Sequence, residues 1–167
     1  MSLVVSMTST GKASSISTVT GASSGFGRLV TERALENGDI VVATLRNPSI
    51  LSDLSTKYSA SQLLVIQLDV SDSAAVTAAF KQAVASFDRV DAVLNNAGFY
   101  VVGEAEGMSD GNSRAMFDTM FWGASSVMRE AVGCFRNINL PMGGLLLNVT
   151  SRTALIPQPG GTLYAAA

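Results

Sequence analysis

The stretch that decides the fold is residues 20–27, which read Thr20-Gly21-Ala22-Ser23-Ser24-Gly25-Phe26-Gly27. It joins a strand-like segment, 14–20, to a helix-like segment, 26–37. Glycines permit a tight turn and a close approach of the backbone to a pyrophosphate, and the following helix N-terminus offers free N–H groups to the phosphates. A Gly/Ser-rich loop without special function is the alternative, but the strand–loop–helix context favours a phosphate loop.

Strand and helix patterns alternate along the rest of the chain. Short apolar or β-branched runs predict strands at 14–20, 40–45, 63–70, 90–95 and 144–150. Helical spacing of apolar residues and capping residues predict helices at 26–37, 49–58, 71–87 and 113–137. This alternation predicts the α/β class, with a Rossmann-like, doubly wound parallel sheet of strand order 3-2-1-4-5.

The composition bounds the domain count and argues against several functions. The chain has 167 residues, 47% apolar and 14% charged, so we expect one domain at 14–167 after a flexible N-terminal arm at 1–13. A net charge of −2 argues against a nucleic-acid partner, and the lack of a long apolar run argues against a membrane partner. The chain has no histidine and one cysteine, Cys134, so we expect no metal site, and we predict a cytoplasmic location.

Four short motifs lie at the ends of the first, third, fourth and fifth predicted strands. The pattern Thr20-Gly-x-x-x-Gly25-x-Gly27 comes first, followed by Asp69-Val70, by Asn95-Asn96-Ala97-Gly98, and by Ser151 with Tyr164. Over residues 14–167 they resemble the short-chain dehydrogenase/reductase family. The resemblance implies an oxidoreductase that transfers a hydride between NADP(H) and a small carbonyl or alcohol substrate.

The resemblance also implies which residues contact the cofactor. Asp69 would hydrogen-bond the adenine ring, and capping of the next helix is the alternative role for its side chain. Asn95 is expected to be structural, whereas the three residues after it are expected to touch the cofactor. The full cofactor-binding set is Gly21, Ser23, Ser24, Gly25, Phe26, Gly27, Arg46, Asp69, Val70, Asn96, Ala97, Gly98 and Tyr164.

The end of the second predicted strand indicates the choice between NAD and NADP. An acidic residue there binds the ribose 2′-hydroxyl, whereas an arginine accommodates a 2′-phosphate. Leu45 stands at the acid position and Arg46 follows it. A guanidinium suits phosphate by its bidentate geometry, so we predict NADP (NADPH) as the cofactor. An ordinary solvated arginine is the alternative.

Ser151 and Tyr164 are the expected catalytic residues. By resemblance, Ser151 would hydrogen-bond the substrate oxygen and Tyr164 would transfer the proton as general acid/base. A strand-end hydroxyl and a packed aromatic side chain are the alternatives. A phenol is a weak acid that needs nearby positive charge to work at neutral pH. In the family that charge comes from the oxidised nicotinamide and from a lysine four residues after the tyrosine.

Two departures from the family pattern bear on activity. Tyr164 is followed by Ala165-Ala166-Ala167, and the chain ends one residue before the position of the lysine. Met120 aligns with an asparagine that completes a proton relay in the family, and a thioether is a weak acceptor. A variant in which water fills the gap, or a local misalignment, is the alternative for Met120.

These departures predict a truncated chain with low or no turnover. The alternative functions are an NADP-binding module without catalysis and an inactive fragment without ligand. In the family, the long helix before the fifth strand and the tyrosine helix commonly form an oligomer interface. Only the first is complete here, so we do not expect a stable homo-oligomer.

Overall fold

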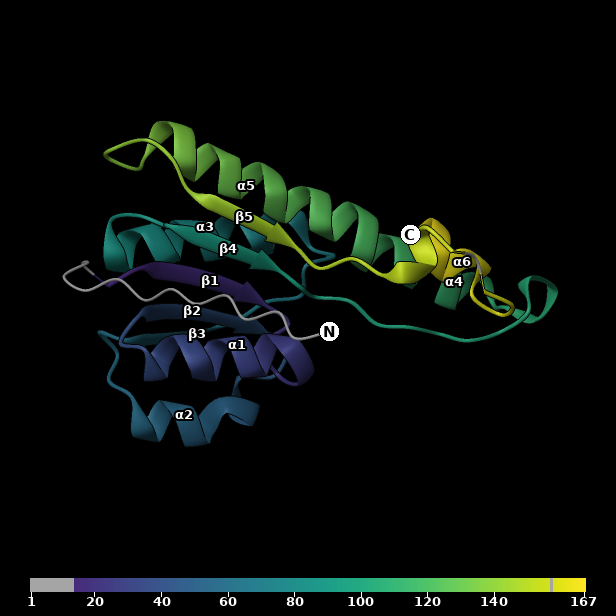
Figure 1. Ribbon diagram of the computed structural model, residues 1–167, viewed down its shortest axis with the longest axis horizontal. Helices are drawn as coiled ribbons and strands as arrows, with labels where there is room; N and C mark the ends of the chain where they lie inside the picture. Colours follow the sequence, from purple (N-terminus) through teal and green to yellow (C-terminus); the bar gives the residue numbers. More distant parts are fainter. Residues whose placement is uncertain (1–13, 157) are drawn as a thin grey trace.

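The computed structural model describes residues 14–156 and 158–167, and its centre is a parallel β-sheet (Figure 1). The strand order is β3-β2-β1-β4-β5, which confirms the predicted topology. The predicted arm, 1–13, lies outside the described residues. All four strand pairings are parallel, and each strand is as long as or shorter than predicted: β1 (Ile16–Thr20), β2 (Ile40–Leu45), β3 (Leu63–Gln67), β4 (Ala92–Asn95) and β5 (Leu145–Asn148).

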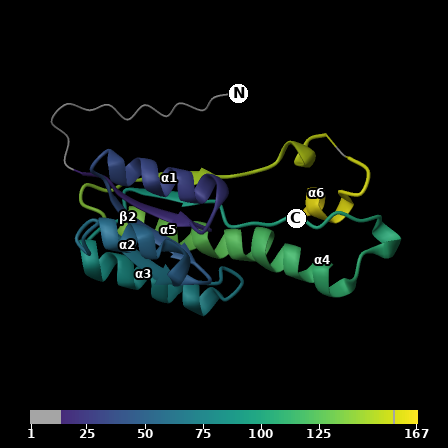
Figure 2. The same cartoon turned by 90° about the horizontal axis from the view of Figure 1, so that it is seen from below.

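Helices cover both faces of the sheet (Figure 2). On one face, Leu35 of α1 (Gly25–Glu36) and Leu54 of α2 (Ser52–Lys57) join a core with alternate residues of β2. On the other face, α3 (Ser73–Phe87) and α5 (Ala124–Asn137) share a second core. The second core includes Val42, Ile66, Val76, Phe80, Val93, Val127 and Phe135.

The predicted helix 113–137 is wrong in its start and in its continuity. The Ser109 hydroxyl accepts a hydrogen bond from the Asn112 amide, so α4 (Asp110–Phe117) begins before the predicted residue. A π-helical segment, Asp118–Gly123, then separates α4 from α5. Such segments insert an extra residue in the turn and are frequent at functional sites. This one faces the carboxyl ends of the strands, as described below.

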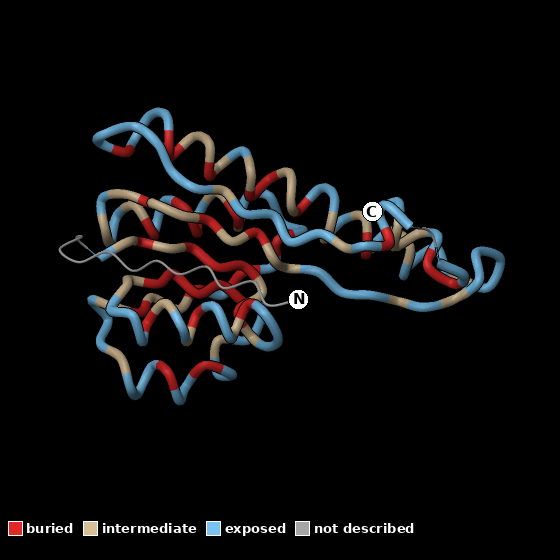
Figure 3. Tube along the Cα trace, in the orientation of Figure 1, coloured by how far each residue is buried: buried red, intermediate tan, exposed pale blue. Residues whose placement is uncertain are grey.

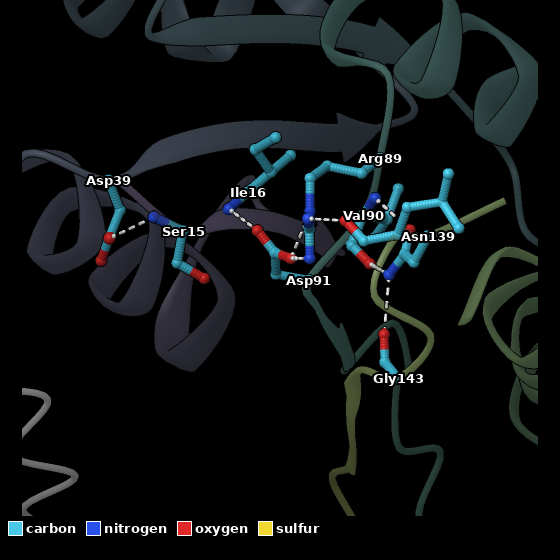
Figure 4. A network of polar contacts seen from close by, with 9 residues as sticks. Ser15, Ile16, Asp39, Arg89, Val90, Asp91, Asn139 and Gly143 are labelled. Atoms are coloured by element: carbon cyan, nitrogen blue, oxygen red, sulfur yellow. Dashed lines mark hydrogen bonds and ion pairs between the residues drawn. The ribbon is translucent and has the colours of Figure 1, made fainter. Parts of the chain in front are cut away.

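Side chains form hydrogen bonds with backbone groups at the amino ends of the strands (Figure 4). The carboxylates of Asp39 and Asp91 accept hydrogen bonds from the first amides of the β1 region, those of Ser15 and Ile16, each at 3.0 Å. Buried Asn139 binds the backbone of Val90 through both its side-chain oxygen and its side-chain nitrogen. Side chains of the same chain therefore satisfy the amides of Ser15, Ile16 and Val90 and the carbonyl of Val90.

Burial differs across the sheet (Figure 3). Residues 41–45 of β2 are all buried, whereas β5 is mostly exposed. Thr18, in the centre of β1, is buried and its hydroxyl has no hydrogen-bond partner among the described residues. Within the same residues, no helix combines the length and the hydropathy that a membrane crossing requires.

Candidate active site

Two adjoining cavities lie at the carboxyl ends of the strands, where ligands bind in sheets of this kind. The first cavity has a volume of about 290 Å³, and the second has a volume of about 750 Å³. Both are lined by Phe26, Asn96, Ala97, Gly98 and Phe99. Other residues that line the first cavity are Gly21, Ser23, Ser24, Gly25, Leu45, Arg46, Leu68, Asp69, Val70 and Thr119.

Two glycines shape the loop between β1 and α1. Gly21 has φ +67, and a Cβ there would lie 3.0 Å from the Cα of Ala97. A Cβ on Gly27 would lie 2.3 Å from the Gly21 carbonyl oxygen and 2.7 Å from Asn96 Nδ2. Only glycine fits these positions without movement of the backbone. Gly27 was predicted to bind the cofactor; it is buried, does not line either cavity, and packs the helix against the loop.

Thr20 and Asn96 tie this loop to the end of β4. The Thr20 hydroxyl oxygen accepts hydrogen bonds from the amides of Asn96 (2.9 Å) and Ala97 (3.0 Å). In return, Asn96 Nδ2 donates to the carbonyl of Thr20 at 2.9 Å and, at 3.4 Å, to that of Gly21. Asn96 was predicted to contact the cofactor, but its side-chain nitrogen already donates hydrogen bonds to the loop. Polar residues at the end of β1 therefore build the cavity edge.

Asn95 has the structural role predicted for it. Its Nδ2 donates to the Ala124 carbonyl and to Asn148 Oδ1, both at 3.0 Å. These bonds join the end of β4 to the start of α5 and to the end of β5. They add to the parallel pairing of β4 with β5, which runs from Ala92–Leu145 to Asn95–Asn148.

Arg46 and Asp69 give the first cavity its charges. The Gln67 side chain donates to the Arg46 carbonyl at 3.1 Å and holds the backbone there. Asp69 Oδ1 accepts from the hydroxyl (2.7 Å) and the amide (3.0 Å) of Ser71. These bonds, with the nearby Arg46 guanidinium, hold the pKa of Asp69 below its usual range, although partial burial acts in the opposite direction.

The helix-capping alternative for Asp69 is wrong. Asp72 caps α3, because its Oδ1 accepts from the amides of Ala74 and Ala75. Asp69 forms a turn with Ser71 instead and lines the first cavity with Val70. The Asp69 carboxylate is therefore free of the helix and exposed to a ligand in this cavity.

Ser151 and Tyr164, the two predicted catalytic residues, line the second cavity together. The Ser151 hydroxyl oxygen accepts hydrogen bonds from the Thr153 amide (3.2 Å) and the Thr153 hydroxyl (2.8 Å). A serine hydroxyl has two acceptor lone pairs and one proton to donate. Thr153 fills both lone pairs, so the Ser151 proton is available to an oxygen in the cavity.

Tyr164 lies on the short helix α6 (Thr162–Ala166) and packs against Tyr100. The two ring centroids are 4.3 Å apart, with an interplanar angle of 49°. The amide of Gly103 donates to the Gly160 carbonyl at 3.0 Å. The segment after β4 thus contacts the segment that carries Tyr164. Motif matching did not predict the contact between Tyr100 and Tyr164, because Tyr100 belongs to no motif.

The π-helical segment contributes to both cavities. Thr119 lines the first cavity, and Met120 lines the second. A Cβ on Gly98 would lie 3.5 Å from both Cγ and Sδ of Met120, so the thioether faces the end of β4. Sequence reasoning placed Met120 at this site but missed Thr119 and Met128, another lining residue of the second cavity. Among the described residues, no cluster of His, Cys, Asp or Glu could hold a metal ion.

Comparison with known proteins agrees with this geometry. A family model for the short chain dehydrogenases matches residues 15–167. Oxidoreductase calM of Penicillium decumbens is 35% identical over 152 residues, which are 89% of this chain and 49% of that protein. The NADP-dependent 3-hydroxy acid dehydrogenase YdfG of Shigella flexneri is 31% identical over 149 residues, 89% of this chain and 58% of that protein.

A solved structure has the same fold. The 3-ketoacyl-(acyl-carrier-protein) reductase of Brucella melitensis, complexed with NADH, has a TM-score of 0.83 at 27% identity and covers 91% of this chain, which spans 63% of that one. The chain spans about half the length of the first curated relatives that it matches, namely 49%, 48% and 53%. The matched region runs from β1 through the glycine loop to the segment that carries Tyr164, and the chain belongs to the short chain dehydrogenase family.

Proposed function

We propose that this protein is an NADP(H)-dependent oxidoreductase that interconverts a small carbonyl compound and the corresponding alcohol. The observation that carries the proposal is the Ser151 hydroxyl, whose acceptor positions are filled by Thr153 and which lines one cavity with Tyr164. This cavity adjoins the first, so a dinucleotide can extend from Arg46 to Tyr164 past the end of β4.

The residues of the first cavity fit a dinucleotide. Because residues 21 and 27 are glycines, no side chain at these positions covers the backbone of the loop. Gly25 and Phe26, in the first turn of α1, line the cavity. A pyrophosphate at this helix N-terminus would receive backbone N–H groups and the positive end of the helix dipole. Asp69 and Arg46 would lie at the adenosine end, and Ser151 and Tyr164 at the nicotinamide end.

When bound, the cofactor supplies or accepts the hydride. The protein's own part is to orient the substrate and to move a proton. Ser151 donates a hydrogen bond to the substrate oxygen, which polarises the carbonyl. Tyr164 gives its phenolic proton to that oxygen in reduction and takes it back in oxidation. Met120 contributes a thioether and no amide to a proton relay beyond Tyr164.

Replacement of the two hydroxyls tests this chemistry. We expect Ser151→Ala and Tyr164→Phe each to lower kcat for NADPH-dependent carbonyl reduction by about 10²–10⁴-fold, because each removes a proton donor at the reacting oxygen. NADPH affinity, measured by fluorescence titration, should not change in Ser151→Ala; in Tyr164→Phe, whose residue also belongs to the predicted cofactor-binding set, it should fall far less than kcat. Tyr58→Phe is the matched control, because Tyr58 packs in the core near α2 and lines neither cavity.

The same measurements distinguish the alternative functions. NADPH binding without turnover by the unmodified protein favours an NADP-binding module. Failure to bind NADPH favours an inactive fragment. Turnover that survives the loss of both hydroxyls would contradict the roles that we assign to Ser151 and Tyr164.

The choice of NADP over NAD rests on Arg46. Its exposed side chain lines the first cavity beside buried Leu45, at the position where an acid would select NAD. Arg46→Ala should weaken NADPH binding by about tenfold or more and leave NADH binding nearly unchanged, since a charge-assisted contact to the 2′-phosphate is lost. Arg136→Ala, on the exposed end of α5, is the control. Equal losses for both cofactors would argue against a 2′-phosphate contact.

Two further parts of the proposal concern the setting of the protein. We also propose a cytoplasmic location, because the single cysteine, Cys134, cannot form an internal disulfide. A stable homo-oligomer is not part of the proposal. The mass measured by light scattering during size-exclusion chromatography tests that expectation.

A further inference from the structure

Arg28 connects the helix that follows the glycine loop to the segment that follows Arg46. It lies near the start of α1, and its guanidinium donates hydrogen bonds to three acceptors. Nε donates to Glu32 Oε1, on the same helix, at 2.7 Å, and Nη2 donates to the carboxylate of Asp53 in α2. Nη1 donates to the backbone carbonyl of Ile50 at 3.2 Å. One side chain therefore joins α1 to two points of the segment after β2.

This segment is a short turn that begins at Arg46. The 3-10 helix Pro48–Leu51 starts two residues after Arg46, and Asn47 caps it by accepting a hydrogen bond from the amide two residues further on. Ile50 belongs to this helix, so Arg28 holds the far end of the turn. Because the turn is short and capped, a shift of its far end also moves the backbone at Arg46.

Arg28 is unsuited to bind the 2′-phosphate itself. Its side chain is 28% exposed and does not line the first cavity, whereas Arg46 does. Its positive charge faces the carboxylates of Glu32 and Asp53, and their combined charge exceeds its own. A further anion would gain little attraction from a guanidinium in this setting. The contacts of Arg28 therefore hold the chain in place and do not bind a ligand.

These contacts also contribute little to global stability. The side chains of Glu32 and Asp53 are 34% and 56% exposed, and ion pairs that water reaches are weak. Buried Leu51 and Leu54 attach the segment to the core instead. Loss of the Arg28 side chain should therefore leave the fold intact and loosen only the polar attachment of the turn.

Resting on the function proposed above, we propose that Arg28 is a positioning residue that sets the preference for NADPH over NADH. It holds residues 46–53 against α1, whose N-terminus would receive the pyrophosphate. The guanidinium of Arg46 is thereby kept at a fixed distance from the pyrophosphate site. NADPH depends on that distance through its 2′-phosphate, whereas NADH lacks this group. Arg28 thus acts on cofactor choice through Arg46.

The dissociation constants of NADPH and NADH, measured by fluorescence titration, test this inference. Arg28→Ala should lower the preference for NADPH by about threefold to tenfold, which is less than the loss expected for Arg46→Ala. Arg33→Ala is the matched control, because Arg33 lies on the same helix, is 74% exposed and contacts Glu36 at 3.4 Å. Urea unfolding should show little change of stability in either variant of α1.

The double variant Arg28→Ala, Arg46→Ala tests whether Arg28 acts through Arg46. Its preference for NADPH should match that of Arg46→Ala alone within about twofold, because the group that Arg28 positions is already absent. Additive losses of preference would mean that Arg28 acts on the cofactor independently, and they would overturn the inference.

Arg28→Lys separates geometry from charge. Lysine keeps a positive charge beside Glu32 and Asp53, but a point charge cannot replace a planar fork that reaches three acceptors. The preference for NADPH should therefore fall in this variant as well, by about twofold or more. An unchanged preference would mean that Arg28 only neutralises the two carboxylates, and the positioning role would be overturned.

The outcomes distinguish this inference from the proposed function. An unchanged preference in Arg46→Ala contradicts the choice of NADP proposed above, and this inference with it. A preference that falls in Arg46→Ala but not in Arg28→Ala overturns the inference alone. Equal losses of affinity for both cofactors in Arg28→Ala also overturn it alone, because a purely structural role would produce them.

Discussion

The two sides of the sheet differ in how far their own packing determines their shape. On the side of the first cavity, β2 lies between β1 and β3 and is buried from Val41 to Leu45. On the side of the second cavity, β5 is the edge strand among the described residues, and Leu145, Leu147 and Val149 are 41%, 40% and 47% exposed. The first cavity stands beside two hydrophobic cores, whereas the second is bounded largely by exposed segments.

The two cavities therefore differ in how firmly the described residues hold their walls in place. Four hydrogen bonds between residues 20–21 and residues 96–97, which are far apart in sequence, fix the glycine loop to the end of β4. The position of Tyr164 depends on its contact with Tyr100 and on one backbone bond between the two segments. We therefore expect cofactor binding to survive perturbations that abolish turnover.

The largest effect is expected at Gly27. In Gly27→Val the new side chain must occupy space held by the Gly21 carbonyl and Asn96, so the loop cannot keep its shape. We expect loss of detectable NADPH binding and a destabilisation of about 3 kcal/mol, measured by urea unfolding. Gly133→Ala in α5 is the control, because a Cβ there meets no atom within 4 Å and should stabilise the helix by about 1 kcal/mol.

Normal NADPH binding by Gly27→Val would break the comparison between the two sides. It would mean that close packing of the helix on the loop does not shape the first cavity. A folded variant without NADPH binding would sharpen the comparison, because it would separate the local role of Gly27 from global stability.

A pair of leucines tests the packing difference directly. Leu51 is fully buried beside β2. Leu51→Ala should lower the free energy of unfolding by about 2–5 kcal/mol, because the cavity left behind is enclosed. Leu147 on β5 is 40% exposed, and Leu147→Ala should cost less than about 1 kcal/mol. Urea unfolding of both variants measures the difference. Equal losses of stability would show that β5 is as firmly packed as β2.

The sequence predicted the fold well because the signals that specify it are local. The glycines of residues 20–27 mark the strand-to-helix turn, and the apolar periods on either side mark the elements. Parallel strands then bring Asp69, the segment after Asn95, and Ser151 to one edge, since all their carboxyl ends point the same way. The motifs thus meet in space although they are far apart in sequence.

Other parts of the site depend on contacts that the sequence does not encode locally. The spacing of apolar residues does not predict the π-helical segment 118–123, because a π-turn differs from an α-turn by only one inserted residue. The saturation of the Ser151 lone pairs by Thr153 depends on the turn that follows β5. Motif matching placed Asn96 and Gly27 among the cofactor contacts, but their packing roles appear only in three dimensions.

The smallest predicted effect on stability comes from the ionisation of Asp69, which lines the first cavity. The pKa of Asp69 is held below its usual value, so its ionised form contributes stability above the ordinary aspartate pKa of about 4. That contribution is lost as pH falls through the lower pKa of the folded state. Asp69→Asn should therefore lose a small amount of unfolding free energy near neutral pH and approach the unmodified protein in acid, as measured by urea unfolding across this range.

Ser71→Ala provides the matched test of the cause. It removes the hydroxyl that donates to Asp69 at 2.7 Å but keeps the amide that donates at 3.0 Å. Its pH-dependent loss should have the same sign as that of Asp69→Asn and be smaller. Arg46→Ala should have the least effect, because Arg46 acts on Asp69 through charge alone. A loss that is the same at every pH in all three variants would mean that these residues stabilise the first cavity by packing and not by the ionisation of Asp69.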